Sequence, residues 1–357
     1  MKGLILAGGH GTRLRPLTHT GPKQLIPIAN KPNILYCLED ILEANIKEIG
    51  VILGDHMPEK VKELLGDGSK YGCKITYIVQ GEPKGIAHAV GCAEKFMGDE
   101  PFVVYLGDNI LKSGIKRFAE EFEKSDAEAS IALCRVDEPR RYGLAYLNEK
   151  GEVIKTVEKP KNPKSDLAVI GIYFFRKSIF EVIKNLKPSW RGEYEITDAI
   201  DALIRKGHKV QAHIVEGWWK DTGKAEDILQ ANHLVLDDLE PVNNGIMERD
   251  ARINGRVSIG EGTVIRAGSY IKGPAVIGRH CEIGPDAYIG PYTSIGDHVK
   301  IVETEIEGSI ILENSEISCG GKIVESLIGK HSIISSSKGK VPAGRRFIVG
   351  ENTRMSI

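Results

Sequence analysis

One pattern in the last third of the sequence leaves little freedom in how that part can fold. Isoleucine recurs at every sixth position without interruption, and a hexapeptide period is typical of a parallel β-helix. In that architecture each hexad supplies one short strand whose isoleucine points inward. The series comprises Ile253, Ile259, Ile265, Ile271, Ile277, Ile283, Ile289, Ile295 and Ile301.

Glycine follows many of these isoleucines, and we expect it to permit a tight corner between strands. The glycines concerned are Gly260, Gly278, Gly284, Gly290 and Gly296. After Ile301 the period loosens, and isoleucines recur at Ile317, Ile323 and Ile328. The β-helix is therefore expected to continue towards the C-terminus.

The first part of the chain alternates short apolar runs with helical patterns, which indicates a mostly parallel sheet with right-handed crossovers. Between residues 130 and 175 the runs become strand after strand, which favours sheet extensions or an antiparallel insertion. The predicted strands are 4–7, 49–53, 75–79 and 102–106, and the predicted helices are 33–44, 59–65, 86–96, 115–122, 197–205 and 225–236. We therefore expect a Rossmann-like α/β domain over 1–238, a linker over 239–252, and a β-helix with a C-terminal tail over 253–357.

The composition argues against nucleic-acid and membrane binding. The formal net charge is -1, so the chain has no overall basic field for either surface. No segment approaches the ~20 apolar residues of a membrane span, and no signal peptide is recognisable. The six cysteines form no metal-binding spacing. We expect reduced thiols in a cytoplasmic protein.

A glycine-rich loop follows the first predicted strand. Gly8, Gly9 and Gly11 allow backbone N–H groups to approach a phosphate. The loop lacks the third glycine of a dinucleotide site and the Lys-Ser/Thr of a P-loop. Instead it carries Arg13, and Lys23 follows ten residues later. These features favour a nucleotide-phosphate site of another kind.

These residues resemble the signature of the sugar-1-phosphate nucleotidylyltransferases. The resemblance rests on Gly8-Gly9-x-Gly11-Thr12-Arg13-Leu14 followed by Pro22-Lys23, and Lys23-Gln24-Leu25 is similar to the thymidylyl branch. It covers nearly the whole chain, because the hexad tail looks like that of long-form members with a left-handed β-helix. It implies a nucleotide site made of Gly8, Gly9, Gly11, Thr12, Gln24, Gln80, Pro83 and Gly85.

The same resemblance implies the catalytic groups. Arg13 and Lys23 would serve the nucleotide phosphates, and Lys159 the incoming phosphate. Asp108 follows a predicted strand, where ligands bind in open α/β sheets. The resemblance pairs it with Asp221 on one Mg²⁺, which prefers carboxylate and phosphate oxygens.

The sugar phosphate is expected on a separate wall of the site, at Asn109, Tyr142, Gly143, Glu158, Lys159, Val169, Tyr173, Arg191 and Trp219. Lys159 and Arg191 would supply positive charge, while Glu158 would accept hydrogen bonds from sugar hydroxyls. Ile170 stands where the resemblance leads us to expect a threonine, so the site would have one polar group fewer there.

The resemblance thus implies transfer from dTTP to glucose 1-phosphate, giving dTDP-glucose and pyrophosphate by one in-line displacement. An enzyme that uses UTP is an open alternative. A second alternative is a bifunctional enzyme whose β-helix transfers acyl groups, for which His280, His298 and His331 are available without a motif around them. A third is that the β-helix only supports or assembles subunits, and we expect a homo-oligomer.

Overall fold

The computed structural model describes residues 1–336 and residue 353. The chain divides into two compact units. The first comprises Met1–Gly11, Thr20–Leu25 and Asn33–Asp221, and the second comprises Thr12–His19, Ile26–Pro32 and the chain from Thr222 onwards. This division differs from a single boundary after residue 238, because two N-terminal segments group with the β-helix. The domain borders at 238 and 252 stay predictions, and most of the expected C-terminal tail lies outside the described residues.

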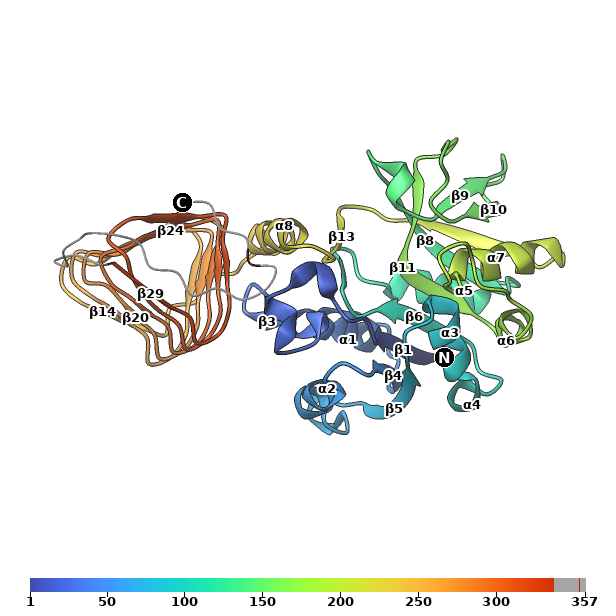
Figure 1. Ribbon diagram of the computed structural model, residues 1–357, viewed down its shortest axis with the longest axis horizontal. Helices are drawn as coiled ribbons and strands as arrows, with labels where there is room; N and C mark the ends of the chain where they lie inside the picture. Colours follow the sequence, from blue (N-terminus) through green and yellow to red (C-terminus); the bar gives the residue numbers. More distant parts are fainter. Residues whose placement is uncertain (337–352, 354–357) are drawn as a thin grey trace. The chain divides into compact units, whose positions relative to one another are not determined.

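A nine-stranded mixed sheet forms the first unit (Figure 1). Its central order is β10-β9-β11-β6-β1-β4-β5, with β8 pairing β11 and β12 pairing β8. Strands β6, β1, β4 and β5 run parallel, whereas β11 is antiparallel to β6. The strands are β1 (Lys2–Ala7), β4 (Glu48–Gly54), β5 (Lys74–Gly81), β6 (Phe102–Leu106), β8 (Ala129–Arg135), β9 (Leu144–Leu147), β10 (Val153–Val157), β11 (Leu167–Phe175) and β12 (Val210–Ile214).

Helices cover both faces of this sheet, which explains why its central strands are continuous apolar runs. On β1, Leu4 and Leu6 face one core, which α3, α6 and α7 complete, while Ile5 and Ala7 face the other core, with α1, α2 and α5. The helices are α1 (Asn33–Glu43), α2 (Pro58–Leu65), α3 (Ile86–Cys92), α4 (Glu94–Met97), α5 (Lys116–Lys124), α6 (Ser178–Ile183) and α7 (Ile196–Arg205). No helix among the described residues is long and apolar enough to cross a membrane.

The expected α/β fold class is confirmed, with local differences. The helix predicted over 86–96 is interrupted at Ala93, whose N–H reaches the Val90 carbonyl at 3.0 Å, so α3 and α4 are separate. Helix α6 and strand β12 were not predicted. A two-stranded ribbon of β7 (Asn109–Leu111) and β13 (Trp219–Asp221) adjoins the sheet. Short 3₁₀ turns are η3 (Lys23–Leu25), η4 (Ser69–Tyr71) and η5 (Pro139–Arg141).

The second unit is built on three parallel sheets of stacked short strands (Figure 1). It also contains η1 (Thr12–Leu14), η2 (Leu17–His19), the hairpin of β2 (Pro27–Ile28) and β3 (Lys31–Pro32), and α8 (Ala225–Leu236). The stacked strands are β14 (Ile246–Met247), β15 (Arg252–Asn254), β16 (Val257–Ile259), β17 (Val264–Ile265), β18 (Tyr270–Lys272), β19 (Ala275–Ile277), β20 (Glu282–Ile283), β21 (Tyr288–Ile289), β22 (Thr293–Ile295), β23 (Lys300–Ile301), β24 (Glu305–Glu307), β25 (Ile310–Ile311), β26 (Glu316–Ser318), β27 (Lys322–Val324), β28 (Leu327–Ile328) and β29 (Ile333–Ser335).

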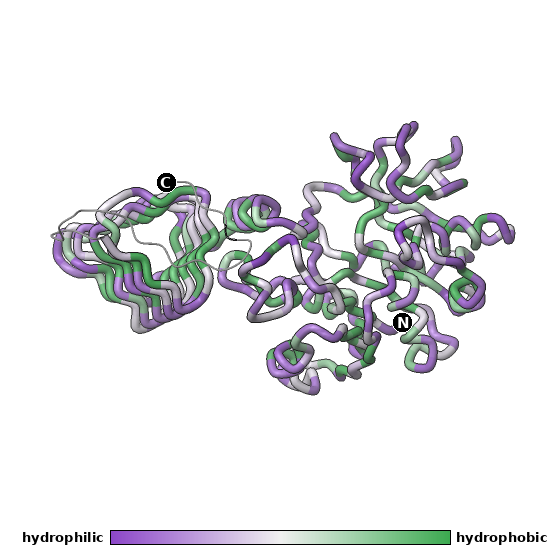
Figure 2. The backbone as a smooth tube through the Cα atoms, viewed as in Figure 1, coloured by the Kyte–Doolittle hydropathy of each residue, from purple (hydrophilic) through white to green (hydrophobic). Residues whose placement is uncertain are grey.

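The repeated isoleucines form the core of the β-helix, as the period predicts. Every one of the nine lies in a strand, and those from Ile259 to Ile301 are at most 1% exposed. Figure 2 shows hydrophobic positions recurring from coil to coil. The looser period after Ile301 reflects shorter coils: Ile283 pairs with Ile301, eighteen residues on, whereas Ile301 pairs with Ile317, sixteen residues on. The shorter coils have fewer residues in the segments between strands. The isoleucines of successive coils therefore still pair and still point inward.

The prediction that the glycines after the isoleucines form the corners of the β-helix is mostly wrong. Of those five glycines only Gly284 has a positive φ. The left-handed corner positions instead carry residues such as His280, Asp286 and His298, with φ of 55, 54 and 59°. Gly260 serves close packing, because a Cβ there would lie 2.7 Å from the Gly278 carbonyl oxygen on the next coil.

A buried asparagine ties the β2–β3 hairpin to the coils of the second unit. Asn232 on α8 is 0% exposed. Its Oδ1 accepts from the Ala29 N–H at 2.8 Å and from Ser294 Oγ at 2.7 Å, and its Nδ2 donates to the Tyr292 carbonyl at 3.1 Å. Ala29 has φ of 47°, a costly conformation for a residue with a side chain, which persists only where the surroundings hold it.

We predict that Asn232→Leu destabilises the protein by about 3 kcal/mol. The substitution leaves two donors and one carbonyl buried without a partner, and each such group costs roughly 1–3 kcal/mol. Urea unfolding followed by circular dichroism measures the loss. Asn185→Leu, at an exposed position after α6, is the control and should change stability by less than about 0.5 kcal/mol. Equal effects of the two substitutions would contradict this role for Asn232.

Candidate active site

The carboxyl ends of the parallel strands meet at one edge of the nine-stranded sheet, where open α/β sheets bind ligands. Gly8 follows β1 at this edge. A Cβ on Gly8 would lie 2.8 Å from Gln80 Oε1 at the end of β5 and 3.2 Å from the Gly54 nitrogen at the end of β4. Gly107 follows β6, and a Cβ on it would lie 2.9 Å from the Leu6 carbonyl oxygen and 3.2 Å from Gln24 Cγ. The edge therefore has no room for a side chain at Gly8 or Gly107.

A chain of polar contacts crosses this edge. Lys23 forms an ion pair with Asp108, whose other oxygen accepts from Asn109 Nδ2 at 3.1 Å. Trp219 Nε1 donates to Asn109 Oδ1 at 2.6 Å. In the β7–β13 ribbon, Asp221 lies directly opposite Asn109. The fold thus brings Lys23, Asp108 and Asp221 to one place from segments far apart in the sequence.

Asp108 is charged although it is only 6% exposed. Burial by itself would raise the pKa of its carboxyl, but the Lys23 ammonium and the Asn109 amide hold that pKa below its usual value. A buried carboxylate is tolerated only where it is paired and hydrogen-bonded. This part of the site therefore contains a buried carboxylate, which Lys23 keeps ionised.

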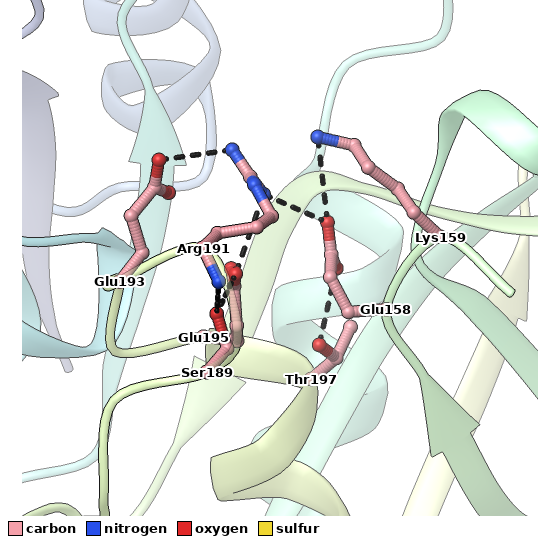
Figure 3. Close-up of polar contacts among 7 residues, drawn as sticks. All are labelled: Glu158, Lys159, Ser189, Arg191, Glu193, Glu195 and Thr197. Carbon is pink, nitrogen blue, oxygen red and sulfur yellow. Dashed lines mark hydrogen bonds and ion pairs between the residues drawn. The ribbon is translucent and has the colours of Figure 1, made fainter.

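Arg191 is the centre of a second charged group (Figure 3). Its guanidinium lies 2.9 Å from Glu193, 3.3 Å from Glu195 and 3.4 Å from Glu158. Ser189 Oγ donates to Glu195 Oε1 at 2.9 Å. Burial, above all, raises the pKa of Glu195, and its neighbours Glu158 and Glu193 add to the shift. Three carboxylates therefore share one guanidinium.

Glu158 connects this group to Lys159 and to Thr197 (Figure 3). Lys159 Nζ lies 3.6 Å from Glu158 Oε1, and Thr197 Oγ1 donates to Glu158 Oε2 at 3.1 Å. A Cβ on Gly143 would lie 2.8 Å from Glu158 Oε2, so no side chain fits there. The Gly143 carbonyl accepts from the Val169 N–H at 2.7 Å, which anchors this wall to β11.

One aromatic contact and one electrostatic effect involve residues of the Asp108 group and of the Arg191 group. The Tyr142 and Trp219 rings meet edge to face, with centroids 5.7 Å apart. Burial raises the pKa of the Tyr173 hydroxyl well above its usual value, and the charges of Glu158 and Asp108 raise it further. Tyr173 therefore lies within electrostatic reach of Glu158 and of Asp108.

Comparison with known proteins identifies the family. A family profile described as nucleotidyl transferase matches residues 2–238, and one described as the GMPPB C-terminal domain matches residues 271–353. The chain belongs to the nucleotidyl transferase family. It is 50% identical over its full length to the low-salt glycan biosynthesis nucleotidyltransferase Agl11 of Haloferax volcanii, all of which it covers.

Two further relatives carry a more specific description. A glucose-1-phosphate thymidylyltransferase of Streptomyces antibioticus is 46% identical, over 100% of this chain and 99% of that one. A crystal structure of a Bacillus anthracis protein, provisionally described as a glucose-1-phosphate thymidylyltransferase and solved with sucrose, has a TM-score of 0.63 and 39% identity. It matches 68% of this chain and 98% of that one.

Enzymes of this family use a divalent metal ion, and the residues present fit one. No three His, Cys, Asp or Glu side chains gather as a metal cluster within the described residues. Asp108 directly precedes Asn109, and Asp221 lies opposite Asn109 in the β7–β13 ribbon, so the backbone places two carboxylate residues next to Asn109. Such a donor set suits an ion that takes its other oxygens from phosphates and water.

The structure groups the predicted site residues unequally. Gly8, Gly9, Gln80 and Lys23 lie at the sheet edge, and Lys23 Cε is 3.5 Å from where a Gly9 side chain would begin. Thr12 and Arg13 belong to η1 of the second unit, so their roles stay predictions. The roles of Gly11 and Pro83 in binding the nucleotide also stay predictions.

Two positions that the sequence assigned to the site, Gln24 and Ile170, are buried in the structure. Gln24 is only 2% exposed, and its Oε1 has no hydrogen-bond partner among the described residues. Ile170, expected to leave the sugar side one polar group short, is buried in the core with Ile172 and Phe174. Its side chain packs in the same core as Ile5 and Ala7, and its effect on the sugar side stays a prediction.

Sequence reasoning missed Ser189, Glu195 and Thr197. Glu195 is the N-cap residue of α7, and the charged run before an apolar helical pattern could have indicated it. Glu158, which shares Arg191 with Glu195, is distant in sequence, so its approach to Arg191 had no signal.

We predict that Lys23→Met destabilises the metal-free protein by about 3–5 kcal/mol, because it leaves the buried Asp108 carboxylate without its counter-charge. The double variant Lys23→Met with Asp108→Asn should recover most of this loss. Thermal and urea unfolding of both variants, after treatment with a chelator, test the pairing. Additive effects of the two substitutions would show that the two side chains do not interact.

Proposed function

We propose that this chain transfers a thymidylyl group from dTTP to glucose 1-phosphate, giving dTDP-glucose and pyrophosphate. The main support is the gathering of Lys23, Asp108 and Asp221 at the sheet edge, beside the Gly8 loop and Gln80. The full-length similarity to a glucose-1-phosphate thymidylyltransferase agrees with this substrate pair. A nucleotide-by-sugar matrix with pyrophosphate release as the readout tests it.

The reaction is an in-line displacement. An oxygen of the sugar 1-phosphate attacks the α-phosphorus of the nucleotide, a new P–O bond forms, and the bond to the bridging oxygen breaks to release pyrophosphate. The nucleophile is already an anion, so no strong general base is required. Catalysis then consists of positioning and charge stabilisation.

The cations of the site divide this work. The backbone N–H groups of the Gly8 loop and the side chains of Arg13 and Lys23 would hold the nucleotide phosphates. Lys159 and Arg191 would hold the incoming phosphate. Both are paired with Glu158, so the phosphate has to compete with that carboxylate. The phosphate would displace Glu158 from these cations only when the sugar hydroxyls bind Glu158 at the same time.

Asp108 and Asp221 would bind Mg²⁺, which neutralises the triphosphate and orients it. A homo-oligomer and a cytoplasmic location also stay predictions of this proposal. For the β-helix we propose support of the catalytic part, since its exposed histidines occupy corners. His280 and His298 stack at 5.2 Å because consecutive coils place corner residues above one another.

We predict that Asp108→Asn and Asp221→Asn each lower kcat by about 10²–10³, the usual effect of losing one preorganised charge-stabilising contact. Asp99→Asn, at an exposed position, is the control and should keep wild-type turnover. Steady-state kinetics with saturating Mg²⁺ and a thermal melt for each variant make the comparison. Near-normal turnover in both site variants would remove the metal assignment.

We predict a preference for dTTP with measurable use of UTP. The two bases share one hydrogen-bonding edge, and the missing methyl is worth only ~1–3 kcal/mol, or roughly 10–200-fold. Gln80→Ala should lower kcat/KM for dTTP and UTP together, whereas Glu82→Ala, exposed in the same loop, should not. If GTP or CTP were the best wild-type substrate, the thymidylyl assignment would be wrong.

A further inference from the structure

The orientation of the Gln80 amide is fixed by two acceptors. Gln80 Nε2 lies 3.3 Å from the Gly85 carbonyl oxygen and 3.1 Å from His88 Nδ1. A carbonyl oxygen can only accept, so the NH₂ end of the amide must face it. The amide oxygen is then turned towards Gly8, 2.8 Å from where a side chain on that residue would begin. Gln80 therefore presents an acceptor, not a donor, at the glycine loop.

His88 has the protonation state that this arrangement needs. Burial, and then the charge of Lys84, lower the pKa of His88 below its usual value, so its imidazole is neutral at pH 7. Its Nε2 faces Cys92 Sγ at 4.0 Å, and its ring lies beside that of Tyr194, with centroids 6.3 Å apart. With the proton on Nε2, the Nδ1 lone pair is available to accept from Gln80.

The second acceptor is held rigidly. Gly85 has φ of 109°, and a Cβ there would lie 2.5 Å from the Tyr194 carbonyl oxygen. That carbonyl accepts from the Ala87 N–H at 3.1 Å, and the Tyr194 N–H donates to the Lys84 carbonyl at 2.8 Å. Only glycine fits between these two hydrogen bonds, and the Gly85 carbonyl also accepts from the Ala89 N–H at 3.2 Å, which holds its direction.

We propose that His88 is a specificity-determining residue, which excludes cytosine by holding the Gln80 amide with its oxygen towards the glycine loop. This inference rests on the proposed function, in which Gln80 contacts the base. An amide oxygen accepts from the N3–H of thymine or uracil. The N3 of cytosine carries no hydrogen, so two lone pairs would oppose each other. His88 thus positions Gln80 and does not itself touch the base.

The test compares His88→Leu with His88→Asn. Both replacements branch at Cγ, but only asparagine offers an acceptor near the place of Nδ1. In His88→Leu one of the two restraints on the amide is lost, and the ratio of kcat/KM for dTTP to that for dCTP should fall about fivefold to tenfold, the size of one hydrogen bond. In His88→Asn the ratio should stay within about twofold of wild type.

Thermal melts establish that each variant is folded, and His88→Phe replaces His88→Leu if the latter is not. An unchanged ratio in the variant without an acceptor, or an equal fall in His88→Asn, would overturn the role of His88. The wild-type kcat/KM values for dTTP, dCTP and GTP, measured in the same series, test the proposed function separately. A wild type that uses dTTP with unchanged selectivity in His88→Leu leaves that function intact, whereas a wild type that prefers GTP overturns both.

Discussion

The ion pair between Lys23 and Asp108 is the interaction on which the site depends. A carboxylate as buried as Asp108 would lose its charge without a partner, and the metal and phosphate chemistry proposed here needs that charge. The pair also fixes neighbours, because the second oxygen of Asp108 accepts from Asn109, which in turn accepts from Trp219. Through the β7–β13 ribbon this order extends to Asp221. One electrostatic requirement at the end of β6 therefore organises residues from three distant segments.

The sugar side follows the opposite rule, because its cations are held by an excess of carboxylates. Arg191 forms ion pairs with Glu158, Glu193 and Glu195, and Lys159 forms one with Glu158. A side chain at position 143 would collide with the Glu158 carboxylate, so this position is a glycine. Such an arrangement binds a phosphate weakly unless hydroxyl groups contact the carboxylates at the same time. Under the proposed function, selection of a sugar phosphate over a simple phosphate would arise from these paired charges. On the nucleotide side, selection would arise from the fixed direction of one amide, since Gly85 and His88 both accept from Gln80.

The β-helix owes its regularity to stacking. Backbone pairing between coils repeats at every strand, and the inward isoleucines keep their register even where coils shorten from eighteen to sixteen residues. The corners absorb the difference, because their left-handed positions accept His, Asp and Asn as well as glycine. Asn232 shows that this unit includes the β2–β3 hairpin, which comes from the N-terminal part of the sequence.

The sequence alone determined the two architectures, since a strict hexapeptide period and a strand–helix alternation each fit few folds. It also determined the positions of β1, β4, β5 and β6, because their apolar runs are continuous, and of most helices, because their apolar residues recur at helical spacing. It indicated the glycine loop, Lys23, Asp108 and Asp221 as chemistry-bearing residues, through the order of motifs. Only the tertiary structure decided that Ile170 faces the core, that Glu195 joins Glu158 around Arg191, and that His88 directs Gln80. These are contacts between side chains distant in sequence or dependent on rotamer and hydrogen-bond direction, and neither periodicity nor spacing encodes them.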